Sequence, residues 1–61
     1  MNKCLCISNC GAFQEGREYL YLAVTKKKNK VVGYRVWPAM DAQYRIFSKE
    51  EFSLAFTEKM R

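Results

Sequence analysis

Apolar and polar residues alternate with a period of two along most of the chain, a pattern typical of half-buried β-strands. The clearest segment is 19–24, where aromatic and aliphatic residues follow one another. Segment 31–37 repeats the pattern after a polar turn at 25–30, so the two segments predict a hairpin. Shorter segments at 3–7 and 43–47 predict two further strands.

The same alternation predicts which side chains face the core. On the hairpin and the later strand, the expected inward residues are Leu20, Leu22, Val24, Val32, Tyr34, Val36, Tyr44 and Ile46. The expected outward residues of the hairpin are Tyr19, Tyr21, Ala23, Val31, Arg35 and Trp37. The sequence therefore predicts an outer hairpin face on which aromatic rings lie beside an arginine.

Residues with special backbone requirements mark where the strands bend and end. Gly33, in the middle of a predicted strand, indicates a bulge or a sharp bend. Pro38 cannot donate to a sheet ladder and is expected to end that strand. Asn29 suits a left-handed conformation in the turn. Phe13 lies between two turn clusters and is expected to anchor a long loop.

The last quarter of the chain begins with a helix-start signal. Ser48 can accept a hydrogen bond from the amide of Glu51 while the Glu51 carboxylate reaches back, which is a capping box. We expect one helical turn at this point. Residues 52–56 then form either a final strand, which we prefer, or an extension of the helix, and residues 57–61 are expected to fray.

Together these elements predict an all-β protein of five short strands with one short helical turn before the last strand. Residues 1–61 are expected to form a single domain, because a chain of 61 residues has room for one core. A sheet that curls on itself is an economical way to limit exposed strand edges.

This layout resembles the small SH3-like barrel proteins often found in phage and prophage genomes. The resemblance rests on the long loop ahead of residues 18–20, the charged hairpin, and the aromatic strand 44–47 that leads into the capped turn and Phe52. It spans about residues 13–56 and implies a five-stranded SH3-like barrel. It also implies a small adaptor or inhibitor that occludes a host or defence protein. The motifs of peptide-binding SH3 domains are absent, so proline-rich peptides are not the expected partner.

Three cysteines, Cys4, Cys6 and Cys10, lie within the first ten residues, and the chain has no histidine. An odd number of clustered cysteines is a poor disulfide framework, so reduced thiols in or near the core are expected. Structural zinc needs four ligands, and no metal or other cofactor is expected. The alternative is a thiolate metal site shared between two chains that associate through the first strand.

The distribution of charge is uneven. Eleven basic and six acidic residues give a net charge of +5, and residues 25–37 contain five basic residues and no acidic one. Those five are Lys26, Lys27, Lys28, Lys30 and Arg35. This asymmetry favours an acidic partner, either protein or nucleic acid. Alternatively, the lysines keep a hairpin turn soluble and protect its strand edges.

The chain offers little for catalysis. Without histidine the commonest general base is missing, and Glu50 and Glu51 are interpreted as helix-start residues. An enzyme is therefore not expected. No signal-peptide core and no run of about 18 apolar residues occurs. We expect a cytoplasmic protein with no membrane contact, either monomeric or homodimeric.

A binding surface is predicted on the outer face of the hairpin. Its expected residues are Tyr19, Tyr21, Lys26, Lys27, Lys28, Lys30, Arg35 and Trp37. Aromatic residues and arginine are common at interface hot spots, so the first hypothesis is a protein partner with an acidic surface. The alternative is a nucleic-acid-binding SH3-like barrel, with lysines on phosphates and rings stacked on bases. In a third interpretation, Tyr19, Tyr21 and Trp37 form a second small core under the long loop.

Overall fold

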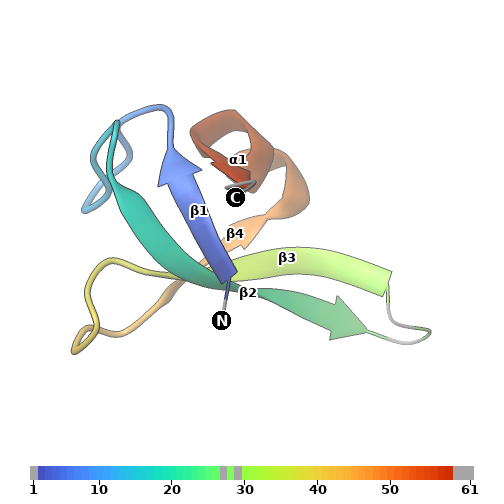
Figure 1. Ribbon diagram of the computed structural model, residues 1–61. Helices are drawn as coiled ribbons and strands as arrows, with labels where there is room; N and C mark the ends of the chain where they lie inside the picture. Colours follow the sequence, from blue (N-terminus) through green and yellow to red (C-terminus); the bar gives the residue numbers. More distant parts are fainter. Residues whose placement is uncertain (1, 27, 29, 59–61) are drawn as a thin grey trace.

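The computed structural model describes residues 2–26, 28 and 30–58. Within these residues the elements, in chain order, are β1 (Asn2–Cys6), β2 (Glu18–Lys26), β3 (Lys30–Trp37), β4 (Arg45–Ser48), α1 (Lys49–Ala55) and β5 (Phe56–Glu58). Neighbouring strands are antiparallel, and the sheet order is β4-β3-β2-β1-β5. The sheet curls into a half-barrel with α1 packed against β3, β4 and β5 (Figure 1). A mostly β protein with one short helix is confirmed.

The hairpin of β2 and β3 contains the predicted irregularity. Val24 pairs with Gly33 whereas Thr25 pairs with Val31, so Val32 is an extra residue that forms a bulge in β3. Gly33 also has a second reason to be glycine. A Cβ at this position would lie 2.7 Å from the carbonyl oxygen of Phe47 in β4. Two strands therefore approach each other here more closely than a side chain would allow.

Helix α1 begins as predicted and continues further than predicted. The Glu51 amide donates to the Ser48 hydroxyl over 3.1 Å, and the Ser48 amide donates to Glu51 Oε1 over 2.9 Å, which completes the capping box. The preferred assignment of residues 52–56 to a strand is wrong, because the helix runs to Ala55. Phe52 and Ala55 lie three residues apart on one helical face and are both buried. This burial favours helix over strand until Phe56, where β5 starts.

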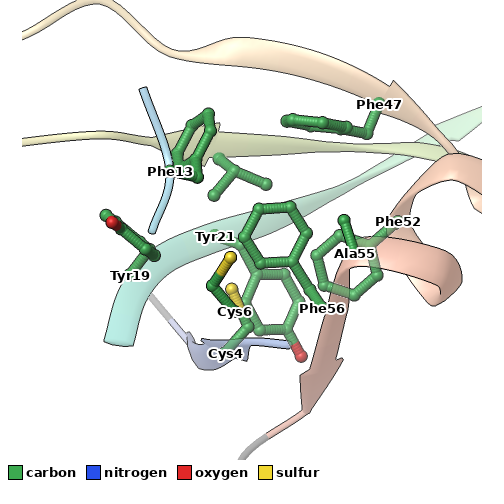
Figure 2. Packing of buried hydrophobic residues seen from close by; sticks show 10 residues of the cluster. Cys4, Cys6, Phe13, Tyr19, Tyr21, Phe47, Phe52, Ala55 and Phe56 are labelled. Carbon is green, nitrogen blue, oxygen red and sulfur yellow. The ribbon is translucent and has the colours of Figure 1, made fainter. Parts of the chain in front are cut away.

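The core is mainly aromatic and fills the concave side of the half-barrel (Figure 2). Phe13, in the long loop, is only 1% exposed and lies at its centre. Its ring centroid is 4.9 Å from that of Tyr19, 5.6 Å from that of Phe47 and 5.4 Å from that of Phe56. The prediction that Phe13 anchors the long loop is confirmed. Edge-to-face contacts of this kind add to the stability gained from burial.

The predicted faces of β2 are reversed. Tyr19 and Tyr21 are buried at 8% and 5% exposure, whereas Leu22 is 37% exposed. The register explains the reversal, because cross-strand partners share one face of a sheet. Tyr21 pairs with Val36, which is fully buried, so Tyr21 must also face the core. Segment 19–24 is apolar on both faces, and the alternation alone cannot tell which face is inward.

The same correction applies to β4 and to the bulge. Ile46 was expected inside but is 66% exposed, while Phe47 is buried. Ile46 pairs with Arg35 and therefore shares the outer face with it. Val32, also expected inside, is 41% exposed because it is the bulged residue. Val36 inside and Arg35 outside are as predicted, and β3 ends at Trp37, directly before Pro38.

Candidate binding surfaces

The predicted site residues do not form one surface, because the fold separates them into three places. Tyr19 and Tyr21 belong to the core. Arg35 and Trp37 lie on the outer face of β3, and Lys26, Lys28 and Lys30 lie at the hairpin end, all three exposed. Lys27 and Asn29 lie outside the described residues. Lys30 and Trp37 are seven residues apart along β3, which corresponds to roughly 20 Å.

Both tyrosines have partners inside the fold. The Tyr19 hydroxyl accepts a hydrogen bond from the Gln14 amide over 2.8 Å and so ties the long loop to β2. Burial raises the pKa of Tyr21, and the Glu58 carboxylate, which accepts a hydrogen bond from its hydroxyl, raises it further. Neither ring is available to stack on a ligand. For these two residues, packing beneath the long loop and against β5 is the structural role.

An apolar surface with a central arginine takes their place on the outer face. We call it the outer patch and define it as Leu20, Leu22, Arg35, Trp37, Tyr44 and Ile46. The strand register sets its rows, because Lys3, Leu20 and Trp37 are aligned across β1, β2 and β3. Leu22, Arg35 and Ile46 form the next row across β2, β3 and β4.

Arg35 and two aromatic residues are held together in the outer patch. The Trp37 and Tyr44 rings meet edge to face with centroids 5.3 Å apart. The Arg35 guanidinium carbon lies 5.1 Å from the centroid of the Tyr44 ring, within the range of a cation–π contact. Tyr44 therefore orients Arg35 while the arginine remains exposed. This contact fixes a positive charge on an apolar surface.

A small hollow adjoins the outer patch where the chain leaves β3. It has a volume of about 250 Å³, and Leu20, Trp37, Pro38 and Met40 contribute to its wall. Drug-sized ligands occupy cavities of about 300–1,000 Å³, so this hollow suits a single side chain better than a cofactor. Met40 at its rim is 91% exposed.

Sequence reasoning missed most of the outer patch. Leu20, Leu22, Tyr44 and Ile46 were all expected to face the core. The signal that could have corrected this was Phe47, because an inward phenylalanine forces its neighbour Ile46 outward in a strand. Choosing Phe47 over Ile46 as the core residue of β4 would have placed Arg35 and Ile46 on one face.

The thiols lie mainly in the core. Cys4 and Cys6 are 0% and 1% exposed, and Cys10 is partly buried. Burial raises the pKa of the Cys4 thiol from 9.0 to about 11, the nearby Cys6 adds to the rise, and a hydrogen bond with the Tyr19 backbone lowers it in part. Sulfur atoms buried in this way do not face a second chain. Among the described residues, no three His, Cys, Asp or Glu side chains are grouped as metal ligands.

Comparison of the chain with protein-family models, with curated proteins and with solved structures finds no match. The described part of the chain contains no helix that is long and apolar enough to cross a membrane. Any statement about function therefore depends on the geometry of the outer patch and of the hairpin end.

Proposed function

We propose that this chain is a non-enzymatic binding module that docks an acidic protein surface on the outer patch, as an adaptor or an inhibitor. The row Leu22–Arg35–Ile46 carries the proposal. Leu22 is 37% and Ile46 66% exposed, on either side of an arginine that is itself exposed. Large exposed apolar side chains gathered on one face are typical of interaction sites.

Charge supports an acidic partner over a second copy of the chain. Arg35 stands exposed within the patch, no acidic residue occupies a patch position, and the border carries one charge of each sign, Lys3 and Glu18. Face-to-face pairing of two patches would bring like charges together, which opposes association. A partner that presents carboxylates around an apolar centre complements both features of the patch.

The hollow beside Trp37 offers a place for one apolar side chain of the partner. Tryptophan and arginine are enriched among the residues that dominate binding energy, and hot spots lie in pockets protected from water. Trp37 is half-buried and its ring contacts the ring of Tyr44, so the ring is already held in place before a partner binds. A preorganised ring loses little conformational entropy on binding.

The fold is consistent with an SH3-like barrel. Strand β4, the capped helix α1 and strand β5 form the strand–helix–strand arrangement on which the resemblance rests, and the sheet is curled. If the resemblance to phage proteins also extends to function, the partner is a host or defence protein whose active surface is covered. Both statements are part of the proposal.

The proposal is tested with a charge placed in the outer patch and a matched charge elsewhere. Ile46→Asp puts a carboxylate beside Arg35, whereas Ile7→Asp puts one at another exposed isoleucine, 44% exposed, just after β1 and outside the outer patch. Immobilised wild-type chain should retain a protein from extracts of its native cells that also forms a stoichiometric complex when purified. Ile46→Asp should weaken that complex at least tenfold in calorimetry, and Ile7→Asp should leave it unchanged.

Three outcomes contradict the proposal. Equal loss in both variants would show that the contact is not specific to the patch. A captured partner whose affinity is indifferent to Ile46→Asp would place the interface elsewhere. Sedimentation that shows a homodimer abolished by Ile46→Asp would mean that the patch binds a second copy.

A further inference from the structure

The end of the hairpin forms a second feature, separate from the outer patch. We call residues 25, 26, 28 and 30–32 the basic tip. Between the turn and the pairs Val24–Gly33 and Gly33–Ser48, β2 and β3 pair only with each other among the described strands. Figure 1 shows this end of the hairpin reaching away from β1 and α1. The tip is thus a two-stranded ribbon that projects from the half-barrel.

Charges of one sign are concentrated on this ribbon. Lys26 and Lys30 are direct cross-strand partners, and Lys28 lies between them with a positive φ of 61°. The described residues of the tip include three lysines and no acidic residue. Like charges directly opposite each other in a sheet are destabilising. An anion bound between the strands removes that repulsion, so the arrangement favours binding of a polyanion.

The dimensions of the tip restrict the kind of polyanion. From Gly33 to the turn, about three residues at 3.3 Å each give a projection of roughly 10 Å. The major groove of B-form DNA is about 8.5 Å deep and 12 Å wide and admits a two-stranded β-ribbon. We propose that the basic tip enters the major groove of double-stranded DNA, where Lys26, Lys28 and Lys30 contact phosphates.

Single-stranded nucleic acid is a poorer fit for this site. Sequence-tolerant binding of single strands depends on exposed rings on which bases stack. Tyr19 and Tyr21 are buried, and the residues described at the tip include no aromatic ring. Duplex RNA fits less well too, because its major groove is deep and narrow. The tip therefore favours duplex DNA, bound through its backbone and without base stacking.

The test is a fluorescence titration of a 16-base-pair DNA duplex of mixed sequence between 50 and 200 mM salt. Nonspecific binding of this class should give a Kd of about 1–100 μM near physiological salt and a lower Kd at 50 mM. The double variant Lys26→Gln/Lys30→Gln should bind at least tenfold more weakly. It should also reduce the slope of log affinity against log salt by about 1.8, since each phosphate contact contributes about 0.9.

The matched control removes two basic residues from elsewhere. Arg17→Gln/Lys49→Gln lowers the net charge equally, and both side chains are exposed. The control should keep the wild-type salt slope, and circular dichroism should confirm that both variants fold. Equal loss in the two double variants, no binding at 50 mM salt, or tighter binding of the matching single strand or RNA duplex would each overturn the inference. The result is independent of docking on the outer patch, because Ile46→Asp leaves the tip lysines intact.

Discussion

Strands β2 and β3 run through two regions that differ in what holds them together. In the half-barrel they contribute Tyr19, Tyr21 and Val36 to an aromatic core. Past Gly33 the same strands carry lysines and exposed or half-buried valines, and they pair only with each other. One hairpin is therefore part of a packed core at one end and a solvent-facing, lysine-rich ribbon at the other.

The two ends of the hairpin differ because a chain this short can bury only a limited apolar surface. A chain of about 60 residues buries only about 60% of the surface that its unfolded form exposes, so it forms one core and no second one. The rings of Phe13, Phe47, Phe52 and Phe56 are all used in that core. The tip has no ring left to cover it. Its sequence is therefore free to serve solubility and binding.

The largest expected effect lies in the centre of the half-barrel. Replacing Phe13 by alanine should lower the free energy of unfolding by about 3–5 kcal/mol, because it removes the ring that three other rings contact. Urea unfolding followed by tryptophan fluorescence measures the change. Met40→Ala, at a 91% exposed position, is the control and should change the free energy by less than about 0.5 kcal/mol. A Phe13→Ala variant as stable as this control would contradict a core centred on the long loop.

A buried thiol makes the stability of the half-barrel depend on pH. The pKa of Cys4 rises from 9.0 to about 11 in the folded state, so between these values the folded chain keeps a proton that the unfolded chain releases. Stability from this group is therefore complete below pH 9 and is lost as the pH approaches 11. At about 1.4 kcal/mol per pKa unit, the loss is about 2–3 kcal/mol.

The contribution of Cys4 is isolated by comparison with Cys4→Ala. The variant is less stable at neutral pH because it loses packing, but its curve of stability against pH should be flatter between pH 9 and 11. Tyr21 is present in both proteins, and because burial and Glu58 are the larger causes of its raised pKa and Cys4 a lesser one, its contribution cancels in large part. Parallel curves for the two proteins would show that the Cys4 thiol is not desolvated.

The sequence predicts the order of the elements well, and it predicts their faces poorly. The Gly33 irregularity, the end of β3 before Pro38 and the capping box are local signals, and all three are confirmed. The inward face of β2 depends on which residues lie opposite in β1 and β3. That information is nonlocal, and a strand that is apolar on both faces does not contain it.

The candidate site shows the same limit. Lys26, Lys28 and Lys30 lie at the hairpin end as predicted, because a turn between two strands is visible in the sequence. The alternation assigns Tyr19 and Tyr21 to the surface because it places Leu20 and Leu22 in the core. Phe13 from the loop and Phe52 from α1 pack against the tyrosines, which places the tyrosine rings in the core. The sequence does not reveal these contacts, because the residues that make them are far apart along the chain.

The boundary between the two regions is tested by Gly33→Ala. The new Cβ would lie 2.7 Å from the Phe47 carbonyl oxygen, so β3 and β4 must move apart. A crowded backbone contact of this kind should cost about 1–3 kcal/mol of unfolding free energy. Val32→Ala, at the adjacent 41% exposed bulge, should cost less. Hydrogen exchange of the Phe47 amide should speed up in Gly33→Ala alone, and unchanged exchange would mean that the close approach is not required.

The smallest expected effect lies at the tip, where the substitution should raise the free energy of unfolding rather than lower it. Lys30→Glu places a carboxylate opposite Lys26 and replaces a repulsive pair by an attractive one. The unfolding free energy should rise by about 0.2–1 kcal/mol at low salt, and the gain should vanish in 1 M salt because exposed charges are then screened. Lys30→Gln, which removes the repulsion without adding attraction, should give a smaller gain. A gain in stability together with a loss of duplex DNA binding would show that the tip lysines serve binding at the expense of the fold. A loss of stability in both variants would instead mean that Lys30 supports the hairpin itself.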